Sequence, residues 1–340
     1  MEHILSLLPD ELVSFVEKKG LASYRGSQLL NWIYNKQTID FNKMTSLPLE
    51  WRDRFNRILD NYIPEIISEQ TSTDATRKFL LELIDGNHIE MVLIPKEEKY
   101  TLCISSQIGC KRNCRFCATA KMGFIRNLTV GEMVAQVFIA QIKSQKKRLN
   151  NIVFMGMGEP FDNYANVEKV IKILQHEKTY NFGARRITIS TSGVIPGIKK
   201  LSNSSLKTRL AISLNSAIQS KREKLMPISR QYSLVDLKPV LHNYSITASF
   251  KVTLEYVLIK NFNMGIKDAR TLKYFAHGIK CKLNLIPWNE VKFFNFRAPD
   301  NNDIKNFIHS LDGLRAMITV RDSKGEDIAA ACGQLAGRFE

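Results

Sequence analysis

Apolar segments of strand length alternate with helical or loop segments over the second half of the chain, and this alternation is the strongest constraint on its fold. Six such segments lie at 151–156, 186–191, 209–214, 251–259, 282–287 and 316–320. Repeated βα alternation predicts a parallel sheet with its chemistry at the carboxyl ends of the strands. Because about six units are fewer than the eight of a closed barrel, we expect an α/β fold built as an open, partial βα barrel.

The first part of the chain has a different pattern, because its apolar residues recur at helical spacing from Ile4 to about Asp60. This periodicity predicts amphipathic helices. We therefore expect a small helical accessory domain over residues 1–65. Residues 1–60 contain eight basic and eight acidic side chains, so the segment carries no net charge.

Two alternating segments follow the helical part. They span 78–84 and 88–94 and are joined by Asp85-Gly86, a dipeptide typical of a hairpin turn. We expect a β-hairpin connector over residues 66–95. The remaining residues, 96–340, are expected to form the barrel and a C-terminal loop.

A further strand at about 100–106 leads into a cysteine-rich segment. After it, Thr129-Val-Gly-Glu132 has the pattern of a capping box, in which side chain and backbone groups at a helix start bond reciprocally. This box predicts a helix that runs to about Lys147.

The chain contains six cysteines, and they are too few for a disulfide scaffold in a chain of this length without a signal peptide. Metal or redox chemistry is the better interpretation. The cysteines are Cys103, Cys110, Cys114, Cys117, Cys281 and Cys332. Cys281 has no partner motif and is expected to be a buried thiol.

Three residues separate Cys110 from Cys114, and two separate Cys114 from Cys117. Three thiolates on one loop can bind three irons of a [4Fe–4S] cluster and leave the fourth iron open to a substrate. Structural zinc would need a fourth protein ligand, for which His176 and Cys332 are the candidates, and the paired elements typical of zinc sites do not occur in the sequence.

The formal net charge of +16 comes from two stretches of the chain. Residues 101–150 hold nine basic and one acidic side chain, and residues 185–230 hold ten and one. A solvated basic face is the usual explanation of such a run. Because both stretches also contain the motifs discussed here, a polyanionic partner such as RNA is the better one.

No uninterrupted apolar stretch approaches the about 18 residues of a membrane span. The first residues, MEHILSLLPDELVSFVEKK, are acidic and amphipathic rather than a basic leader before an apolar block. We therefore expect a cytoplasmic protein that does not associate with membranes.

The cysteine spacing after a strand, with Phe116 directly before Cys117, resembles the motif of radical S-adenosylmethionine (SAM) enzymes. Further motifs narrow the match to the RlmN-type 23S rRNA (adenine-2) methyltransferases. These motifs are Met155-Gly-Met-Gly-Glu-Pro160, Ser190-Thr-Ser-Gly193, Ser213-Leu-Asn215, Ile286-Pro-Trp-Asn289 and Ala331-Cys-Gly-Gln-Leu-Ala-Gly337, together with Cys103. The resemblance runs from the helical amino end to the last residues, and Asn215 departs from it where His is more usual.

The resemblance implies an activity and its cofactors. Such an enzyme methylates carbon 2 of one adenine in 23S rRNA and also the adenine immediately 3′ to the tRNA anticodon. It uses one [4Fe–4S] cluster bound by Cys110, Cys114 and Cys117, and two SAM molecules, one of which yields a 5′-deoxyadenosyl radical. The expected partners are the two RNAs and an external electron donor such as flavodoxin with its reductase, and the enzyme is expected to be a monomer.

Three residues receive catalytic roles from the resemblance. Cys332 accepts a methyl group, and the methylene radical formed from it adds to carbon 2. Glu90 accepts the proton of carbon 2, and Cys103 then releases the product by forming a disulfide with Cys332. By pattern alone Glu90 would face solvent from its strand and Cys103 would be a buried thiol, although the apolar neighbours of Glu90 indicate partial burial.

The resemblance also assigns the contacts to SAM. Several of these residues stand at predicted strand ends, where ligands are reached in such sheets. Each would more often be a cap or turn residue if it occurred alone. The predicted contacts are Gly158, Glu159, Ser190, Ser213, Leu214, Asn215 and Asn289.

Two other functions stay open from the sequence. The first is a sibling enzyme that methylates carbon 8 of the same adenine and confers antibiotic resistance; Pro160 and the Pro287-Trp288 pair resemble the carbon-2 branch instead. The second is a zinc-stabilised RNA-binding module without catalysis.

Overall fold

The computed structural model describes residues 1–144, 148–289, 291 and 294–337. Within these residues one mixed sheet has ten strands in the order β14-β13-β12-β11-β10-β9-β6-β5-β4-β3. Seven of them run parallel to one another. They are β6 (Lys99–Cys103), β9 (Arg148–Phe154), β10 (Ile187–Thr191), β11 (Arg209–Ser213), β12 (Val252–Leu258), β13 (Cys281–Pro287) and β14 (Met317–Val320).

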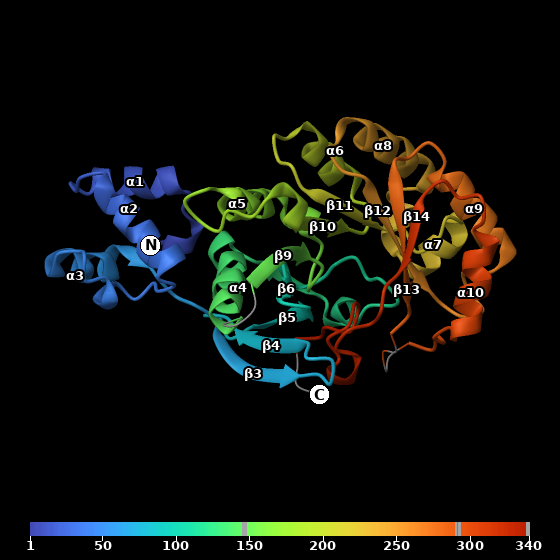
Figure 1. Ribbon diagram of the computed structural model, residues 1–340, viewed down its shortest axis with the longest axis horizontal. Helices are drawn as coiled ribbons and strands as arrows, with labels where there is room; N and C mark the ends of the chain where they lie inside the picture. Colours follow the sequence, from blue (N-terminus) through green and yellow to red (C-terminus); the bar gives the residue numbers. More distant parts are fainter. Residues whose placement is uncertain (145–147, 290, 292–293, 338–340) are drawn as a thin grey trace.

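One long helix lies between each of these parallel strands and the next. The six helices are α4 (Val130–Lys143), α5 (Tyr164–Gln175), α6 (Ile195–Asn203), α8 (Leu234–Thr247), α9 (Ile266–Ala276) and α10 (Asn301–Ser310), and a short helix, α7 (Gln219–Leu225), precedes α8. Figure 1 shows them along the outside of the curved sheet. Since β14 and β3 are edge strands, the sheet does not close, and the predicted open, partial barrel of about six units is confirmed.

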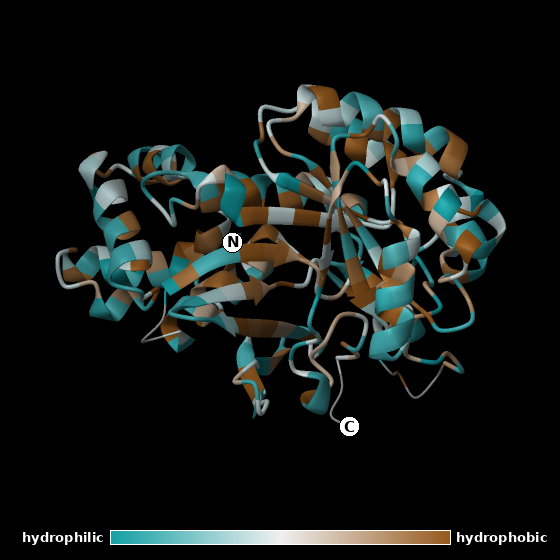
Figure 2. Ribbon diagram, turned by 45° about the vertical axis from the view of Figure 1, so that its right-hand side comes forward, coloured by the Kyte–Doolittle hydropathy of each residue, from teal (hydrophilic) through white to brown (hydrophobic). Residues whose placement is uncertain are grey.

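The hydropathy of the elements explains this arrangement. Strands in the centre of the sheet are mostly apolar, whereas the helices alternate between apolar and polar faces (Figure 2). A sheet that is covered by helices on one face and by packed loops on the other must be apolar on both faces. The central strand β12 is accordingly buried along most of its length.

Helix α4 begins as the capping box predicts. The Thr129 hydroxyl accepts a hydrogen bond from the Glu132 N–H at 3.2 Å, and the Glu132 carboxylate accepts one from the Thr129 N–H at 2.8 Å. The helix ends at Lys143 rather than at about Lys147. Because β9 begins at Arg148, the chain must leave the helix earlier; residues 145–147 lie outside the described part of the chain.

The predicted hairpin is present and belongs to the main sheet. Strands β4 (Arg77–Glu82) and β5 (His88–Lys96) pair antiparallel, and β5 pairs antiparallel with β6. An edge strand, β3 (Glu65–Thr71), pairs with β4 and was not predicted. Its side chains are largely polar and alternate between exposed and half-buried positions, so it lacks the apolar signal of a strand.

The amino-terminal segment is mostly helical, and we call its helices, α1 (Pro9–Lys18), α2 (Tyr24–Leu30) and α3 (Leu49–Ile58), the helical module. Strand β1 (Glu2–His3) pairs with β2 (Leu59–Asp60), so the two ends of the module meet. The module lies beside α4 and α5 in Figure 1. Its apolar residues belong to the same core cluster as those of the barrel.

No helix in the described residues is long and apolar enough to cross a membrane.

Candidate active site

The three clustered cysteines lie on one loop, the cluster loop, between strands β7 (Gln107–Gly109) and β8 (Phe124–Asn127). The loop is closed at its base by a hydrogen bond of 2.8 Å from the Cys110 N–H to the Gly123 carbonyl. Gly109 has φ of 70° there, and a Cβ on it would lie 1.8 Å from the same carbonyl oxygen. A side chain at position 109 would therefore force the loop open.

Two other parts of the chain hold the cluster loop. The Arg115 N–H donates to the carbonyl of Leu225, the last residue of α7, at 2.8 Å. From the other side, the Ala118 N–H donates to the Gly333 carbonyl at 2.6 Å, and the Thr119 hydroxyl donates to the Leu335 carbonyl at 2.7 Å. We call residues 330–337 the C-terminal segment; it and α7 fix the loop between them.

A single cavity brings most of the predicted site residues together at the carboxyl ends of the parallel strands. Its walls come from the cluster loop, from the turns after β9 to β13 and from the C-terminal segment. The predicted residues that line it are Cys110, Cys114, Cys117, Gly158, Glu159, Ser190, Ser213, Asn215, Asn289 and Cys332. Glu90, Cys103 and Leu214 do not line it.

The turn after β9 carries Glu159 into this cavity. Gly158 has φ of 103°, and a Cβ on it would lie 2.6 Å from the side chain of Gln107. The Gln107 amide oxygen accepts a hydrogen bond from the Glu159 N–H at 2.8 Å. The Glu159 carboxylate in turn accepts bonds from the N–H and hydroxyl of Ser192, both at 2.7 Å. Gln107 and Ser192 thus fix Glu159, and sequence reasoning missed both.

Leu214 and Asn215 both follow β11, but only Asn215 lines the cavity. Leu214 is buried in the core, and its N–H donates to the Glu255 carbonyl at 2.9 Å. The side chain of Leu214 therefore has no surface in the cavity with which to make the expected contact with SAM. Asn215 lines the cavity with φ of 56°, and its amide oxygen accepts a bond from the Val257 N–H at 2.9 Å. It thereby ties the end of β11 to β12.

Asn289 connects the sheet to the segment that carries Cys332. Its amide nitrogen donates to the Cys332 carbonyl at 3.3 Å, and its amide oxygen accepts a hydrogen bond from the Ser323 hydroxyl. The predicted SAM contact thus also fixes the backbone next to the predicted methyl acceptor.

The cluster loop suits an iron–sulfur cluster better than a single metal ion. Burial raises the pKa of Cys110 to about 12 and also raises the pKa values of Cys114 and Cys117, so these thiols need a bound cation to become thiolates. In the described part of the chain no three His, Cys, Asp or Glu side chains surround one point as a single ion requires. In a cubane each thiolate binds a different iron, so the sulfurs stand farther apart.

His176 does not supply the fourth protein ligand that a structural zinc ion at the cluster loop would need. That residue follows the last turn of α5, and its Nδ1 accepts a hydrogen bond from the Lys178 N–H at 3.1 Å. Because α5 runs back from the strand ends, its last turn lies toward the opposite edge of the sheet. The structure therefore does not bring His176 to the cluster loop.

The two isolated cysteines meet at a second, smaller cavity next to the first. Cys332 lines both cavities, whereas Cys103, at the end of β6, lines only the second. Both are free thiols. Burial raises the pKa of Cys103 to about 12, and a charge on Cys332 would raise it further. Arg321 lines both cavities as well and was not predicted.

Glu90 is the third residue of β5 and is more deeply buried than expected, with 1% of its surface exposed. One carboxylate oxygen accepts hydrogen bonds from the N–H groups of Ala336 at 2.7 Å and Gly337 at 2.9 Å. The other oxygen lies 3.3 Å from the Lys78 ammonium nitrogen. Glu90 thus binds the C-terminal segment that carries Cys332.

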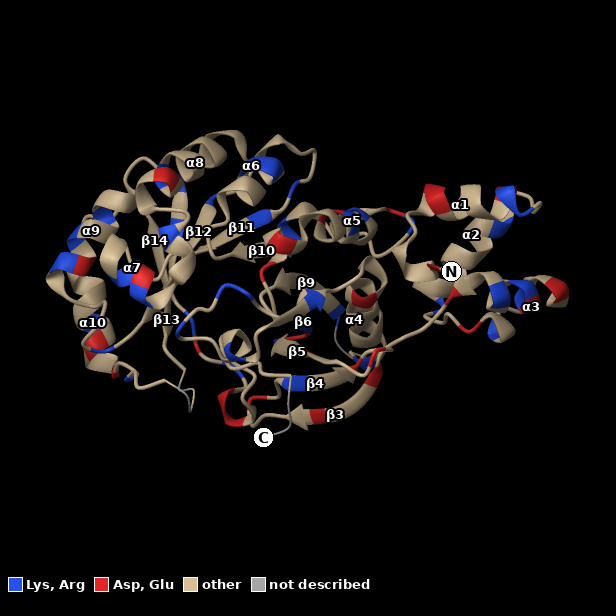
Figure 3. Cartoon of the chain, turned by 180° about the vertical axis from the view of Figure 1, so that it is seen from behind, with Lys and Arg blue, Asp and Glu red and all other residues tan. Residues whose placement is uncertain are grey.

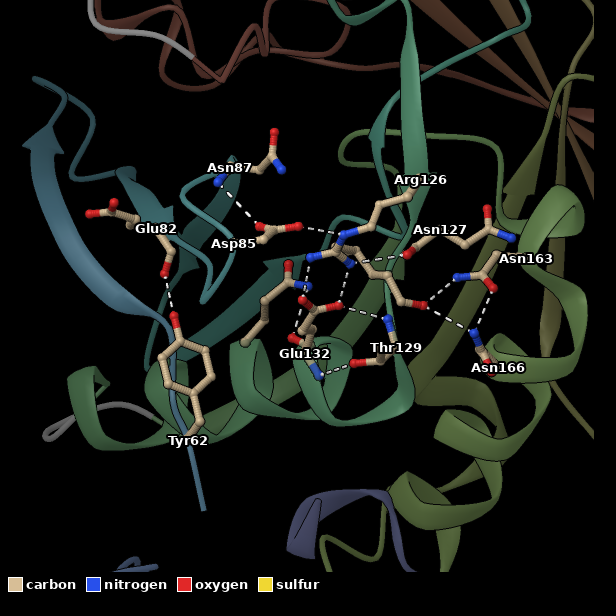
Figure 4. Close-up of polar contacts among 12 residues, drawn as sticks. Tyr62, Glu82, Asp85, Asn87, Arg126, Asn127, Thr129, Glu132, Asn163 and Asn166 are labelled. Atoms are coloured by element: carbon tan, nitrogen blue, oxygen red, sulfur yellow. Dashed lines mark hydrogen bonds and ion pairs between the residues drawn. The ribbon is translucent and has the colours of Figure 1, made fainter. Parts of the chain in front are cut away.

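Strand β8 is anchored by a set of charged and polar side chains that we call the Arg126 junction: Asp85, Arg126, Asn127, Glu132 and Asn163 (Figure 4). The Arg126 guanidinium donates to Asp85 at 2.7 Å and to both oxygens of Glu132 at 2.8 and 2.9 Å. Asn127 accepts a bond from Gln107 at 2.8 Å, and Asn163 donates to the Leu128 and Ser106 carbonyls. The junction joins the hairpin turn, β8 and the first turns of α4 and α5.

The basic residues of the two predicted stretches fall into groups with different surroundings. Several are paired or buried: Arg112 and Lys111 with Asp162, Arg126 in its junction, Lys143 with Glu69, Lys221 with Asp268, and Arg222 in the core. Four exposed residues lie on or next to the cluster loop: Arg115, Lys121, Lys224 and Arg230. Over the helical module, basic and acidic residues are mixed (Figure 3).

Two family models match separate parts of the chain. The model described as "Radical SAM superfamily" matches residues 104–271, which include the cluster loop. The model described as "Ribosomal RNA large subunit methyltransferase N-terminal domain" matches residues 3–60, which include the helical module.

Several proteins match nearly the whole chain. A protein of Pseudothermotoga lettingae named "Probable dual-specificity RNA methyltransferase RlmN" is 44% identical over 334 residues, covering 98% of this chain and 97% of its own. A protein of Nitratiruptor sp. named "Dual-specificity RNA methyltransferase RlmN" is 41% identical over 350 residues, covering 98% of each. The crystal structure of a radical SAM methyltransferase from Sphaerobacter thermophilus matches with a TM-score of 0.96 at 38% identity, over 99% of this chain and 100% of that one.

Proposed function

Because this chain belongs to the RlmN family of radical SAM RNA methyltransferases, we propose that it methylates carbon 2 of a specific adenine in 23S rRNA. We propose the adenine 3′ to the tRNA anticodon as a second substrate, since the similar proteins are named dual-specificity enzymes. The observation that carries the proposal is the placement of five cysteines around two adjoining cavities: three on the cluster loop, Cys332 between the cavities, and Cys103 at the second.

The thiols of the cluster loop are the proposed ligands of one [4Fe–4S] cluster, and the main cavity is the proposed SAM site. When bound and reduced, the cluster supplies the electron that cleaves SAM into methionine and a deoxyadenosyl radical. The backbone at Gly158 and the carboxylate of Glu159 would bind the amino end of SAM. Further polar groups of the walls that would hold it are Ser190, Ser213, Asn215 and Asn289, with Leu214 contributing backbone alone.

Cys332 is the proposed methyl acceptor. Carbon 2 of adenine lies between two ring nitrogens and is electron-poor, so it cannot displace a methyl group from SAM itself. A thiolate can do so, with the sulfur of SAM leaving as a neutral thioether. The position of Cys332 on the wall of the main cavity supports this role.

Cys103 is the proposed resolving thiol. Once the carbon on Cys332 is joined to adenine, attack of the Cys103 sulfur on the Cys332 sulfur forms an S–S bond and breaks the S–C bond. The electron pair stays on the carbon, which takes a proton to become the methyl group. An external donor then returns two electrons to the disulfide. The cavity that both cysteines line supports this step.

Glu90 is the proposed acceptor of the carbon-2 proton; the electron that the radical adduct loses with this proton would return to the cluster, which is oxidised when SAM is cleaved. Its carboxylate is bonded to the C-terminal segment and lines neither cavity. For a base to act, it must come within hydrogen-bond reach of the proton that it removes. The C-terminal segment must therefore release Glu90 when the adenine enters, and its movement would carry Cys332 with it.

RNA docking is proposed for the exposed basic residues beside the cluster loop. Arg115, Lys121, Lys224 and Arg230 can contact phosphates while one adenine leaves its stack to enter the cavity. Replacing all four by Gln should weaken RNA binding and flatten its salt dependence. The control replaces Arg185, Arg186, Lys207 and Arg209, which precede or begin β10 and β11 at the opposite edge, and should leave the salt slope unchanged.

We further propose an external electron donor such as flavodoxin with its reductase, a monomeric state and a cytoplasmic location. The first is proposed because reduction of the cluster needs an electron source, and the last because the proposed RNA substrates are cytoplasmic.

The test of the proposed function is anaerobic incubation of the holoenzyme with SAM, a reductant and unmodified 23S rRNA or tRNA, followed by mass spectrometry of the nucleosides. We expect 2-methyladenosine, and none with the Cys332→Ala variant. Methylation of carbon 8 would assign the chain to the sibling activity instead. Absence of both SAM cleavage and methylated adenine would refute the proposal.

A further inference from the structure

Arg222 is a fully buried arginine in α7, with 1% of its surface exposed. Its guanidinium donates to the carbonyls of Ser192 at 2.7 Å, Ser213 at 3.1 Å and Leu214 at 3.1 Å. A fourth hydrogen bond goes to the hydroxyl of Ser229. Ser192 directly follows β10, Ser213 ends β11 and Leu214 follows it, so one side chain holds the ends of both strands at the wall of the main cavity.

All four acceptors of Arg222 are neutral. Among the described residues no carboxylate forms an ion pair with it, whereas Arg112 on the cluster loop is paired with Asp162. Burial of a cation without an anion is costly, and buried charges are normally paired or next to a metal site. The surroundings of Arg222 therefore favour an anion that binds beside it.

The cluster loop is the place for that anion. The Leu225 carbonyl, one turn beyond Arg222, accepts the Arg115 N–H, and Met226 lines the main cavity with Cys114. Ser192 and Ser213, whose carbonyls accept hydrogen bonds from Arg222, line the same cavity as Cys114. A [4Fe–4S] cluster with three thiolate ligands has a net negative charge, and it gains one more negative charge on reduction.

We propose that Arg222 is the counter-charge of the iron–sulfur cluster and raises its reduction potential, while its hydrogen bonds position the turns after β10 and β11. The inference rests on the proposed function in one respect: the three cysteines must bind a cluster. A positive charge in a buried, low-dielectric site stabilises the more negative, reduced state. Arg222 is therefore a positioning residue that acts through the cluster rather than on the substrate.

A purely structural role is the competing explanation, because buried arginines also satisfy carbonyl groups at the ends of strands. In that case only the geometry of the hydrogen bonds matters. Replacement of the charge would then disturb the SAM site but leave the potential of the cluster unchanged. The potential thus separates the two explanations, whereas activity does not.

The experiment is a redox titration of the reconstituted holoenzyme, followed by the electron paramagnetic resonance signal of the reduced cluster, with iron content measured on the same samples. We compare wild type with Arg222→Gln, which removes the charge, and Arg222→Lys, which keeps it. The expected result is a lower midpoint potential in Arg222→Gln at full iron content and a potential close to wild type in Arg222→Lys. The matched control is Lys224→Gln, an equal loss of charge at an exposed position two residues along, which should leave the potential unchanged.

An unchanged potential in Arg222→Gln, or an equal decrease in the Gln and Lys variants, would overturn the counter-charge role. If Arg222→Gln does not retain the cluster, Arg222→Met, which also removes the charge, takes its place: a lowered potential supports the role, and an unchanged one overturns it. Wild-type protein that binds no iron would instead refute the proposed function, so the two failures are distinguishable.

Discussion

Arg222 and Arg126 lie in two regions that differ in whether the buried or half-buried guanidinium is paired with carboxylates. In the Arg126 junction the guanidinium is 30% exposed and bonds two carboxylates, which raises its own pKa and lowers that of Asp85 to about 2. At the main cavity the guanidinium of Arg222 is buried and bonds only neutral oxygens. The paired charges of the Arg126 junction hold elements of the fold together. The buried charge of Arg222, which forms no ion pair among the described residues, instead indicates a place where an anionic ligand would bind.

From this comparison we expect substitutions in the two regions to have different effects. Substitutions of the cysteines around the cavities should abolish the chemistry and leave folding nearly unchanged, because backbone hydrogen bonds hold the cluster loop in place. Substitutions in the Arg126 junction should reduce stability and leave the chemistry of the folded fraction unchanged. Variants that violate this division would show that the two regions are coupled.

The largest effect is expected from Cys114→Ala. Removal of one thiolate leaves the cluster with two ligands, so iron binding and SAM cleavage should be lost. The fold should persist, since backbone groups hold the cluster loop at Arg115 and Ala118. Iron content, absorbance near 400 nm and release of 5′-deoxyadenosine measure the loss; Cys281→Ala, at a buried thiol away from both cavities, is the control with full iron content.

The two isolated cysteines should fail at different steps. Cys332→Ala lacks the methyl acceptor, so no bond to RNA forms. Cys103→Ala can be methylated at Cys332 and can add to adenine, but it lacks the thiol that breaks the link, so a covalent protein–RNA complex should accumulate. Denaturing gels should show cross-linked RNA only for Cys103→Ala, and normal turnover of this variant would refute the resolving role.

Glu90→Gln should also accumulate the covalent complex. A glutamine oxygen still accepts the N–H groups of Ala336 and Gly337, so the C-terminal segment keeps its place, but the basic carboxylate is gone. Loss of a general base costs about 10²–10⁴-fold in rate. The control, Lys78→Met, removes the ion pair and keeps the base; if single-turnover methylation slows equally in both variants, Glu90 acts only as an anchor of the segment.

Much of the fold and the ligand set could be predicted because periodicity and spacing act locally. The βα alternation predicts the barrel, Asp85-Gly86 predicts the hairpin, and the cysteine spacing predicts one loop with three thiols. The strand-end motifs predict most of the cavity wall. For these features the sequence neighbours of a residue determine its place.

Contacts between distant segments account for what could not be predicted. Arg222 stands in the run Lys-Arg-Glu-Lys, which is typical of a solvated helix face, and only the packing of α7 against the strand ends buries it. The close approach of the C-terminal segment to Glu90 joins residues 246 and 247 positions apart. One contact did have a sequence signal, since the hairpin register sets Glu90 opposite Leu80 and thus diagonal to Lys78 on the same face.

Arg126→Gln tests the expectation that the Arg126 junction contributes to stability and not to the chemistry. The variant loses charge-assisted hydrogen bonds to Asp85 and to the nearly buried carboxylate of Glu132. We expect the free energy of unfolding to fall by about 1–3 kcal/mol. Urea denaturation measures this loss, while iron content and SAM cleavage per folded molecule should match wild type; a selective loss of SAM cleavage would show that the junction controls the cavity.

The smallest expected effect is the pH dependence of the Asp85 contribution. The hydrogen bond from Arg126 is the main cause that lowers the pKa of Asp85 from 3.8 to about 2 in the folded state. A lowered pKa stabilises the fold above the unfolded value and loses this contribution as pH falls from about 4 through about 2.

Since 36% of the Asp85 side chain is exposed and solvent screens its charge, its contribution at neutral pH should stay below about 1 kcal/mol. The difference in unfolding free energy between wild type and Asp85→Asn should therefore be largest near pH 7 and shrink below pH 4, as urea titrations at a series of pH values can measure. In the Arg126→Gln background the same difference should be small and nearly constant with pH. A difference that persists undiminished there would assign the shift to Asn87 and the turn backbone instead of to Arg126.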